Sequence, residues 1–228
     1  MVPSAKANSQ STKRTYCPKG ETPMTEKYSF TKEIGDIYRL KIPFENIYTS
    51  SFLIKTDIGA VLVDCGSSGE DVDRYLIPAL AEAGYSLGDI KMLLLTHGHK
   101  DHAGGLERIL TLAPNIEVVR EARELCDGVE AYPMAGHTAD SIGVLDTRCG
   151  ALISGDGLQG AAVGRFRLSV KERKEYLETL ERVRRDGRIS ALLFSHQYEP
   201  WNSGRIVGRR AVPEALDKCL EIIKGEKK

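Results

Sequence analysis

The chain has 228 residues, of which 41% are hydrophobic and 28% are charged, a composition typical of an ordinary globular protein. Lysine plus arginine equals aspartate plus glutamate at 32 each, so no overall charge favours a nucleic acid or an anionic membrane as a partner. No apolar run approaches the roughly 18 residues of a membrane span. The five cysteines include no Cys-x-x-Cys pair, so neither a disulfide framework nor a thiolate zinc site is indicated, and we expect a cytoplasmic protein.

The first 26 residues differ in character from the rest of the chain. They are rich in Ser, Lys, Thr and Pro and carry few large apolar side chains, so they have little surface to bury. This segment lacks the apolar stretch of a secretory signal, and Met24 is an alternative start. We predict a flexible N-terminal extension over 1–26 and a single domain over 27–228.

The first half of that domain shows strands and helices in turn. Polar and apolar residues alternate where a strand is half buried, and apolar residues recur at helical spacing before Gly84, which ends a helix. Strands are predicted at 36–43, 51–56, 59–66, 91–96 and 116–120, and helices are predicted at 70–85 and 105–113.

The second half repeats this order. A strand pair is predicted at 141–147 and 151–156 around the turn 148–150, followed by a charged amphipathic helix at 170–186. A strand at 189–196 and a helix at 213–225 complete the pattern. The repetition predicts two similar halves whose sheets pack face to face, with helices outside.

The five histidines all fall at strand ends or in loops. His97, His99 and His102 follow the apolar strand at 91–96 within "THGHKDHAGG", while His137 precedes a strand and His196 ends one. Loops at strand ends can converge on one pocket, and neutral imidazole is the commonest metal ligand in proteins. His97 and His99 can point to one side while Asp101 and His102 turn to a neighbouring point. One run of sequence can therefore serve two metal ions.

This segment resembles the signature of the metallo-β-lactamase superfamily. Four further motifs resemble those of that family and occur in the family's order: "VLVDCG" at 61–66, "GHTADS" at 136–141, "LISGD" at 152–156 and "LLFSH" at 192–196. The resemblance implies an α+β fold, the four-layered αββα sandwich of that family.

The resemblance also implies a role for each motif residue. His97, His99 and His137 would hold the first metal ion, and Asp101, His102 and His196 would hold the second. Asp156 would bridge the two ions, and Asp64 would position ligands without binding metal. The implied cofactors are two divalent metal ions, with zinc preferred over manganese or iron, and Asp101 and Asp156 are the predicted catalytic residues.

The residue types at two of these positions narrow the choice among the branches of the family. Asp156 stands where the thiolate-using zinc β-lactamases have cysteine, and His99 stands where the diiron oxygen-reducing flavoproteins have glutamate. The near-neutral charge disfavours the RNA-processing branch. The remaining group is similar to glyoxalase II, acyl-thioesterases and lactonases, although only 32 residues follow His196, too few for the helical substrate domain of glyoxalase II.

We therefore predict a dinuclear-metal hydrolase that uses a metal-bound hydroxide to cleave a small ester, thioester or lactone. A mononuclear iron persulfide dioxygenase is the alternative from another reaction class, and a β-lactam or phosphodiester hydrolase is a further one. The expected partner is a small acyl compound rather than a nucleic acid or a membrane. The sequence allows a homodimer without specifying one.

Two segments are predicted to reach the rim of the substrate pocket, since one follows Asp156 and the other follows His196. Their aromatic side chains could bound an apolar group, and their arginines could bind a carboxylate. The candidate substrate-binding residues are Arg165, Phe166, Tyr198, Trp201 and Arg205. Tyr48 is a weaker candidate.

Overall fold

The computed structural model describes residues 28–159, 170–198 and 203–225, with the side chains of 170–172 and 198 outside the description. The predicted N-terminal extension lies outside these residues. Among them, no helix is both long enough and apolar enough to cross a membrane.

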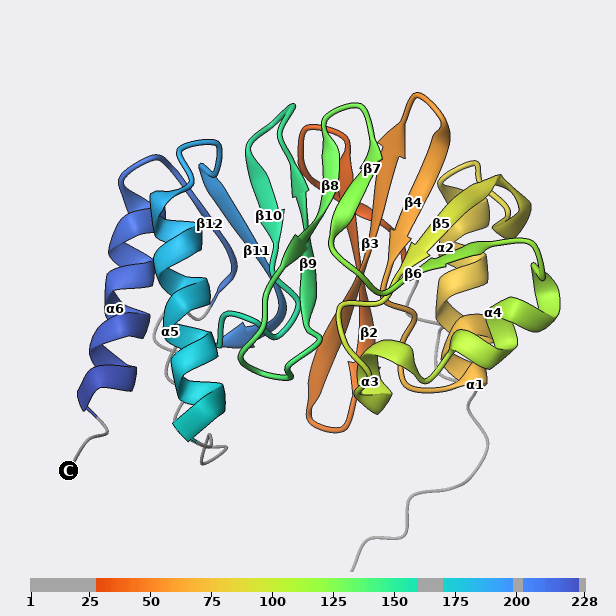
Figure 1. Cartoon of the computed structure of the whole chain (residues 1–228). Coiled ribbons are helices and arrows are strands. Elements are labelled where there is room, and N and C mark those ends of the chain that lie inside the picture. Colours follow the sequence, from red (N-terminus) through yellow and green to blue (C-terminus); the bar gives the residue numbers. More distant parts are fainter. Residues whose placement is uncertain (1–27, 160–169, 199–202, 226–228) are drawn as a thin grey trace, which may run out of the picture.

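The described chain forms four layers, helices–sheet–sheet–helices (Figure 1). Two six-stranded sheets face each other, in the orders β1-β2-β3-β4-β5-β6 and β12-β11-β10-β9-β8-β7. Helices α1, α2 and α4 cover the outer face of the first sheet, and α5 and α6 cover that of the second. The predicted αββα sandwich is confirmed.

The first sheet is antiparallel from β1 to β4 and parallel from β4 to β6. Its strands are β1 (Thr31–Ile34), β2 (Ile37–Phe44), β3 (Ile47–Thr56), β4 (Gly59–Val63), β5 (Ile90–Leu94) and β6 (Glu117–Val119). Its helices are α1 (Gly69–Asp71), the π-helical turn η1 (Val72–Leu76), α2 (Ile77–Glu82), the short 3₁₀ turn η2 (Leu87–Asp89), α3 (Lys100–Ala103) and α4 (Leu106–Leu112). Because β4 and β5 are parallel neighbours, the loops that follow them meet at one edge of the sheet.

The second sheet is antiparallel except where β10 lies parallel to β11. Its strands are β7 (Arg123–Cys126), β8 (Val129–Pro133), β9 (Ile142–Asp146), β10 (Ala151–Ile153), β11 (Ala191–Tyr198) and β12 (Ser203–Val207). Its helices are α5 (Val170–Arg185) and α6 (Ala211–Gly225).

Three apolar clusters hold the layers together. The central cluster lies between the sheets and joins side chains such as Phe52 and Val63 of the first sheet to Ile153 and Leu193 of the second. The other two clusters lie beneath the outer helices of each half. Burial of these three interfaces removes apolar surface from water and is the main stabilising term of the fold.

The structure differs from the sequence predictions at several elements, among them β1 and α3, which were not predicted. The predicted helix at 70–85 is divided into α1, a π-helical turn and α2. The hairpin β7–β8 was not predicted, although Asp127 and Gly128 form its turn and Gly128 has the positive φ that such a turn uses. Strand β12 occupies part of the segment interpreted as a pocket loop.

Candidate metal centre

The loop after β5 carries four of the predicted ligand residues. The buried strand ends at Leu94, and His99, with extended backbone, is the N-cap of α3. The single turn of α3 then carries Asp101 and His102, and the His102 side chain is fully buried. Gly104 closes this turn against the preceding loop, where a Cβ atom would lie 2.1 Å from the carbonyl oxygen of Ser67. Only glycine permits that approach.

The second sheet supplies the other three ligand residues. His137 lies in the loop between β8 and β9, which is joined to the first sheet by the hydrogen bond from the backbone N–H of Ile142 to Thr96 O, 2.8 Å. Asp156 follows β10, and His196 lies within β11, where the pairing register with β12 shifts. The ligand residues therefore come from both sheets and meet at one edge of the sandwich.

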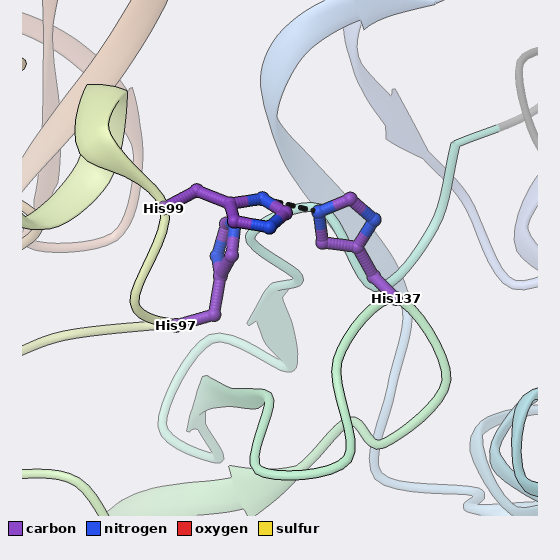
Figure 2. A group of neighbouring side chains, drawn as sticks. All are labelled: His97, His99 and His137. Atoms are coloured by element: carbon purple, nitrogen blue, oxygen red, sulfur yellow. Dashed lines mark hydrogen bonds between the residues drawn. The ribbon is translucent and has the colours of Figure 1, made fainter. Parts of the chain in front are cut away.

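His97, His99 and His137 form the first ligand group. Each offers one nitrogen atom, and these atoms lie within 4.8 Å of one another. Figure 2 shows the three rings converging, with Nε2 of His137 2.9 Å from Nδ1 of His99. Three converging imidazole nitrogens are a ligand set that suits zinc and other divalent transition metals.

Asp101, His102 and His196 form the second group. Oδ2 of Asp101 lies 3.3 Å from Nε2 of His102 and 3.2 Å from Nε2 of His196.

Asp156 lies between the two groups. Its Oδ1 is 3.4 Å from Nε2 of both His102 and His196, while its Oδ2 is 3.6 Å from Nε2 of His137. The two oxygens of one carboxylate thus face different groups, which is the placement required of a bridging ligand.

Buried atoms without partners test whether a cation fits this arrangement. Among the described residues, Nε2 of His97, Nε2 of His102 and Oδ1 of Asp156 are buried and lack a hydrogen-bond partner. An unsatisfied buried polar group costs about 1–3 kcal/mol, more if charged. All three atoms belong to predicted metal ligands, so a divalent cation would satisfy atoms that the protein leaves unsatisfied. The residues fit the metal ions that the resemblance implies.

The ionisation of these side chains is uneven. Burial lowers the pKa of His97 to about 2 and also lowers the pKa of His137. Burial acts in the same direction on His102 and His196, but the Asp64 charge beside His102 and the hydrogen bond between Asp101 and His196 outweigh it, so both pKa values are raised. The pKa of Asp156 is held well below its usual value by His102 despite burial. Burial therefore favours neutral imidazole at His97 and His137, whereas His102 and His196 pair as imidazolium with carboxylate when no metal is bound.

Asp64 lies behind the second group and holds it in place. It is fully buried, with a left-handed backbone (φ 58°) that is strained for a residue other than glycine. Its carboxylate accepts hydrogen bonds from the backbone N–H and Oγ1 of Thr96 and, at 2.7 Å, from Nδ1 of His102. Since a carboxylate can only accept, Nδ1 of His102 carries the hydrogen and Nε2 is left to face the other ligands.

Four contacts around the ligands were not predicted. The backbone carbonyl of Tyr48, rather than its side chain, accepts from Nδ1 of His196 at 2.7 Å. Thr49 donates to Oδ2 of Asp101 at 3.1 Å, and the buried Gln159 places its side-chain amide 3.0 Å from Nδ1 of His137. Nδ1 of His97 lies 3.2 Å from Oγ1 of Thr96. Of these residues, only Thr96 adjoins a motif histidine in sequence, and that adjacency was the one available signal.

The predicted substrate contacts are mostly outside the described part of the chain. Arg165, Phe166 and Trp201 lie outside the described residues, as does the side chain of Tyr198 at the end of β11. Arg205 lies on β12, where its Nη1 donates to the backbone carbonyl of Glu33 and to that residue's carboxylate. Whether these residues contact a substrate stays a prediction.

Comparison with known proteins agrees with the motifs. Residues 46–125 match the family pattern of the metallo-beta-lactamase superfamily. A hydroxyacylglutathione hydrolase of Legionella pneumophila (strain Corby) is 26% identical over 190 residues, which cover 72% of this chain and 71% of that enzyme. Ribonuclease J of Mycobacterium tuberculosis is 41% identical over 64 residues, which cover 26% of this chain and 11% of that enzyme.

A solved structure supports the fold. The metallo-beta-lactamase FIM-1 from Pseudomonas aeruginosa, in its mono-zinc form, superimposes with a TM-score of 0.68. The similarity covers 90% of this chain and 98% of that one at 15% sequence identity, so it concerns the fold alone.

Proposed function

We propose that the chain is a metal-dependent hydrolase of the metallo-beta-lactamase superfamily, and that it binds two divalent metal ions and cleaves a small ester, thioester or lactone. One observation carries this proposal. The structure brings seven histidine and aspartate side chains into two groups, with the carboxylate of Asp156 between them.

In this proposal His97, His99 and His137 hold one ion and Asp101, His102 and His196 hold the other, with Asp156 shared. Zinc is the preferred ion, and manganese or iron would also accept this set of nitrogen and oxygen ligands. Such a pair of ions supplies Lewis acidity and a water molecule whose pKa falls to about 7.

The protein side chains then orient the reaction. In the metal-free protein, the nearby His102 and His196 hold the pKa of Asp101 well below its usual value despite burial, so this side chain is an ionised carboxylate that can act as a ligand and as an acceptor. Thr49 donates to Oδ2 of Asp101, and Nε2 of His102 and of His196 lie 3.3 Å and 3.2 Å from the same oxygen. We propose that Asp101, besides binding the second ion, orients a water molecule by accepting its hydrogen bond.

An acyl substrate is favoured over the alternatives by the extended similarity to an enzyme whose name describes hydrolysis of an acylated glutathione. The similarity to ribonuclease J is confined to 64 residues, and it keeps phosphodiester hydrolysis as the second candidate. The resemblance gives a mononuclear iron persulfide dioxygenase nearly the same ligand residues, so this alternative is separated from the hydrolase by metal count and by oxygen consumption.

The test is a panel of small esters, thioesters, lactones, β-lactams and phosphodiesters, assayed with the metal-loaded protein. We expect turnover of at least one acyl class that is abolished by a chelator and restored by added metal. Hydrolysis confined to phosphodiesters, or oxygen consumption with a persulfide by a protein that holds a single iron, would overturn the acyl-hydrolase proposal.

A further inference from the structure

The side-chain amide of Gln159 faces the ring of His137. Gln159 is only 4% exposed, and the structure places its amide nitrogen, Nε2, 3.0 Å from Nδ1 of His137. The oxygen and nitrogen ends of an amide have nearly the same shape, so the neighbouring groups decide which end faces the ring. On the other side of the ring, Nε2 of His137 faces His99 and Asp156.

The role of Nε2 determines which end of the Gln159 amide faces His137. A ring nitrogen that binds a cation must have a free lone pair, so the hydrogen of a neutral His137 belongs on Nδ1. An Nδ1–H group needs an acceptor, and of the two ends of the Gln159 amide only the oxygen is one, so the amide is turned over to place its oxygen against the ring.

Three of the other four ligand histidines follow the same rule, whereas His99 turns its Nδ1 toward His137. Nδ1 of His102 donates to Asp64, and Nδ1 of His196 donates to the carbonyl oxygen of Tyr48. Oγ1 of Thr96 gives its own hydrogen to Asp64, so at 3.2 Å it can only accept from Nδ1 of His97. An oxygen acceptor behind each of these rings leaves Nε2 for the metal side.

Helix α5 holds both partners of the His137 contact. The hydroxyl oxygen of Tyr176 accepts from the backbone N–H of Gln159 at 3.3 Å. The same tyrosine packs against Gly136, where a Cβ would lie 2.4 Å from Cδ2 of Tyr176, and the φ of 143° at Gly136 also requires glycine. One turn along α5, Oγ1 of Thr179 donates to the carbonyl of Ala135 at 2.7 Å.

We propose that Gln159 is a positioning residue for the first metal ion: its amide oxygen accepts the Nδ1–H of His137, and α5 holds both through Tyr176. This inference rests on the metal centre of the proposed function. The inference adds that α5, an outer helix of the second half, determines the tautomer and the orientation of the ligand residue His137.

Two substitutions of similar size distinguish the role of Gln159 as a hydrogen-bond acceptor from its role in packing. Gln159→Met removes the acceptor and keeps the length of the side chain, whereas Gln159→Glu keeps an acceptor and removes the donor. Zinc affinity of the first equivalent should fall roughly tenfold or more in Gln159→Met and stay near that of the unsubstituted protein in Gln159→Glu. Tyr176→Phe should give a smaller loss in the same direction. Ile223→Val, in the same apolar cluster but on α6, should change nothing and controls for a slightly weakened core.

The ring-nitrogen NMR shifts of His137 in the metal-free protein provide the independent measurement. We expect the Nδ1–H tautomer in the unsubstituted protein and in Gln159→Glu, and a mixture of tautomers in Gln159→Met. The role of Gln159 is overturned if the unsubstituted protein has the Nε2–H tautomer, or if Met and Glu weaken the first equivalent equally. Failure of the unsubstituted protein to bind zinc, with the Nδ1–H tautomer present, would instead overturn the metal centre.

Discussion

The guanidinium of Arg39 in β2 donates a 2.7 Å hydrogen bond to the backbone carbonyl of Phe194 in β11 and so joins the two sheets through a buried charge. Arg39 is 1% exposed and also donates to the carbonyl of Gly204 and the hydroxyl of Ser50, while Glu33 accepts from its Nε. Phe194 lies two residues before His196, and Ser50 follows Thr49, which contacts Asp101. The arginine therefore ties together the strands that bring the second ligand group into register.

Arg39→Met should lower the free energy of unfolding by about 2–4 kcal/mol, because it removes the donor to the carbonyls of Phe194 and Gly204 and one of the two arginines that pair with Glu33. Arg39→Lys should recover only part of this loss, since an ammonium group cannot reproduce the planar fork of donors. Urea denaturation measures both. Arg108→Ala, which breaks an ion pair exposed at both ends, is the matched control, with an expected change of about 0–1 kcal/mol. A loss for Arg39→Met no larger than that of the control would show that the sheets do not depend on this arginine.

Asp64→Asn should weaken binding of the second metal ion about 10–100-fold. Both oxygens of Asp64 accept hydrogen bonds, from Thr96 and from His102, so an asparagine NH₂ group would face a donor on one side. Zinc titration against a chelating indicator measures the effect. Asp146→Asn changes another buried carboxylate, at the far end of β9 beside Arg148, and should leave metal binding unchanged. Equal zinc affinity in both variants would contradict a positioning role for Asp64.

Much of the centre could be predicted because its residues are local in sequence. The four ligands between His97 and His102 follow one apolar strand, and the motifs around His137, Asp156 and His196 are short. Thr49, by contrast, lies 52 positions before Asp101, and Arg39 lies 155 positions before Phe194, so only the folded sheets bring these pairs together.

Some secondary structure was missed for a different reason. The edge strand β12 pairs on one side only and shows no fully buried residue, so it lacks the apolar alternation that identifies a half-buried strand. The hairpin β7–β8 did carry a signal, the Asp127-Gly128 turn between short strands. Charged residues interrupt the apolar alternation on both sides of that turn, so the hydrophobic pattern does not identify the two strands.

The two metal sites should respond differently to pH. Burial lowers the pKa of His97 to about 2 and also lowers that of His137, so protons compete less with metal at these two ligands as pH falls. The raised pKa values of His102 and His196 mean that metal must displace protons from the second group, so its affinity should fall as pH falls. Zinc titrations at about pH 6 and about pH 8 should show the second equivalent weakening much more than the first. Parallel weakening of both would contradict this assignment of charge.

We predict that anionic substrates depend on Arg165 and Arg205, which lie in the segments that follow Asp156 and His196 in the sequence. An arginine–carboxylate contact contributes about 1.5–3 kcal/mol when partly desolvated, so Arg165→Ala and Arg205→Ala should raise KM for an anionic acyl substrate roughly tenfold more than for its neutral analogue. The effect at Arg205 should be the smaller, because Glu33 already compensates part of its charge. Metal content should not change. Equal effects on both analogues would assign these side chains to the solvated surface.

The proposed metal centre depends most directly on a single carboxylate, that of Asp156, which serves two cations. Elemental analysis of protein purified without chelators should give about two equivalents of metal for the unsubstituted chain and about one for His196→Ala, which loses a ligand of the second group alone. Asp156→Ala should lose metal from both groups and lose turnover, because its two oxygens face His137 on one side and His102 and His196 on the other. Two full equivalents of metal and undiminished turnover in Asp156→Ala would contradict the proposed centre.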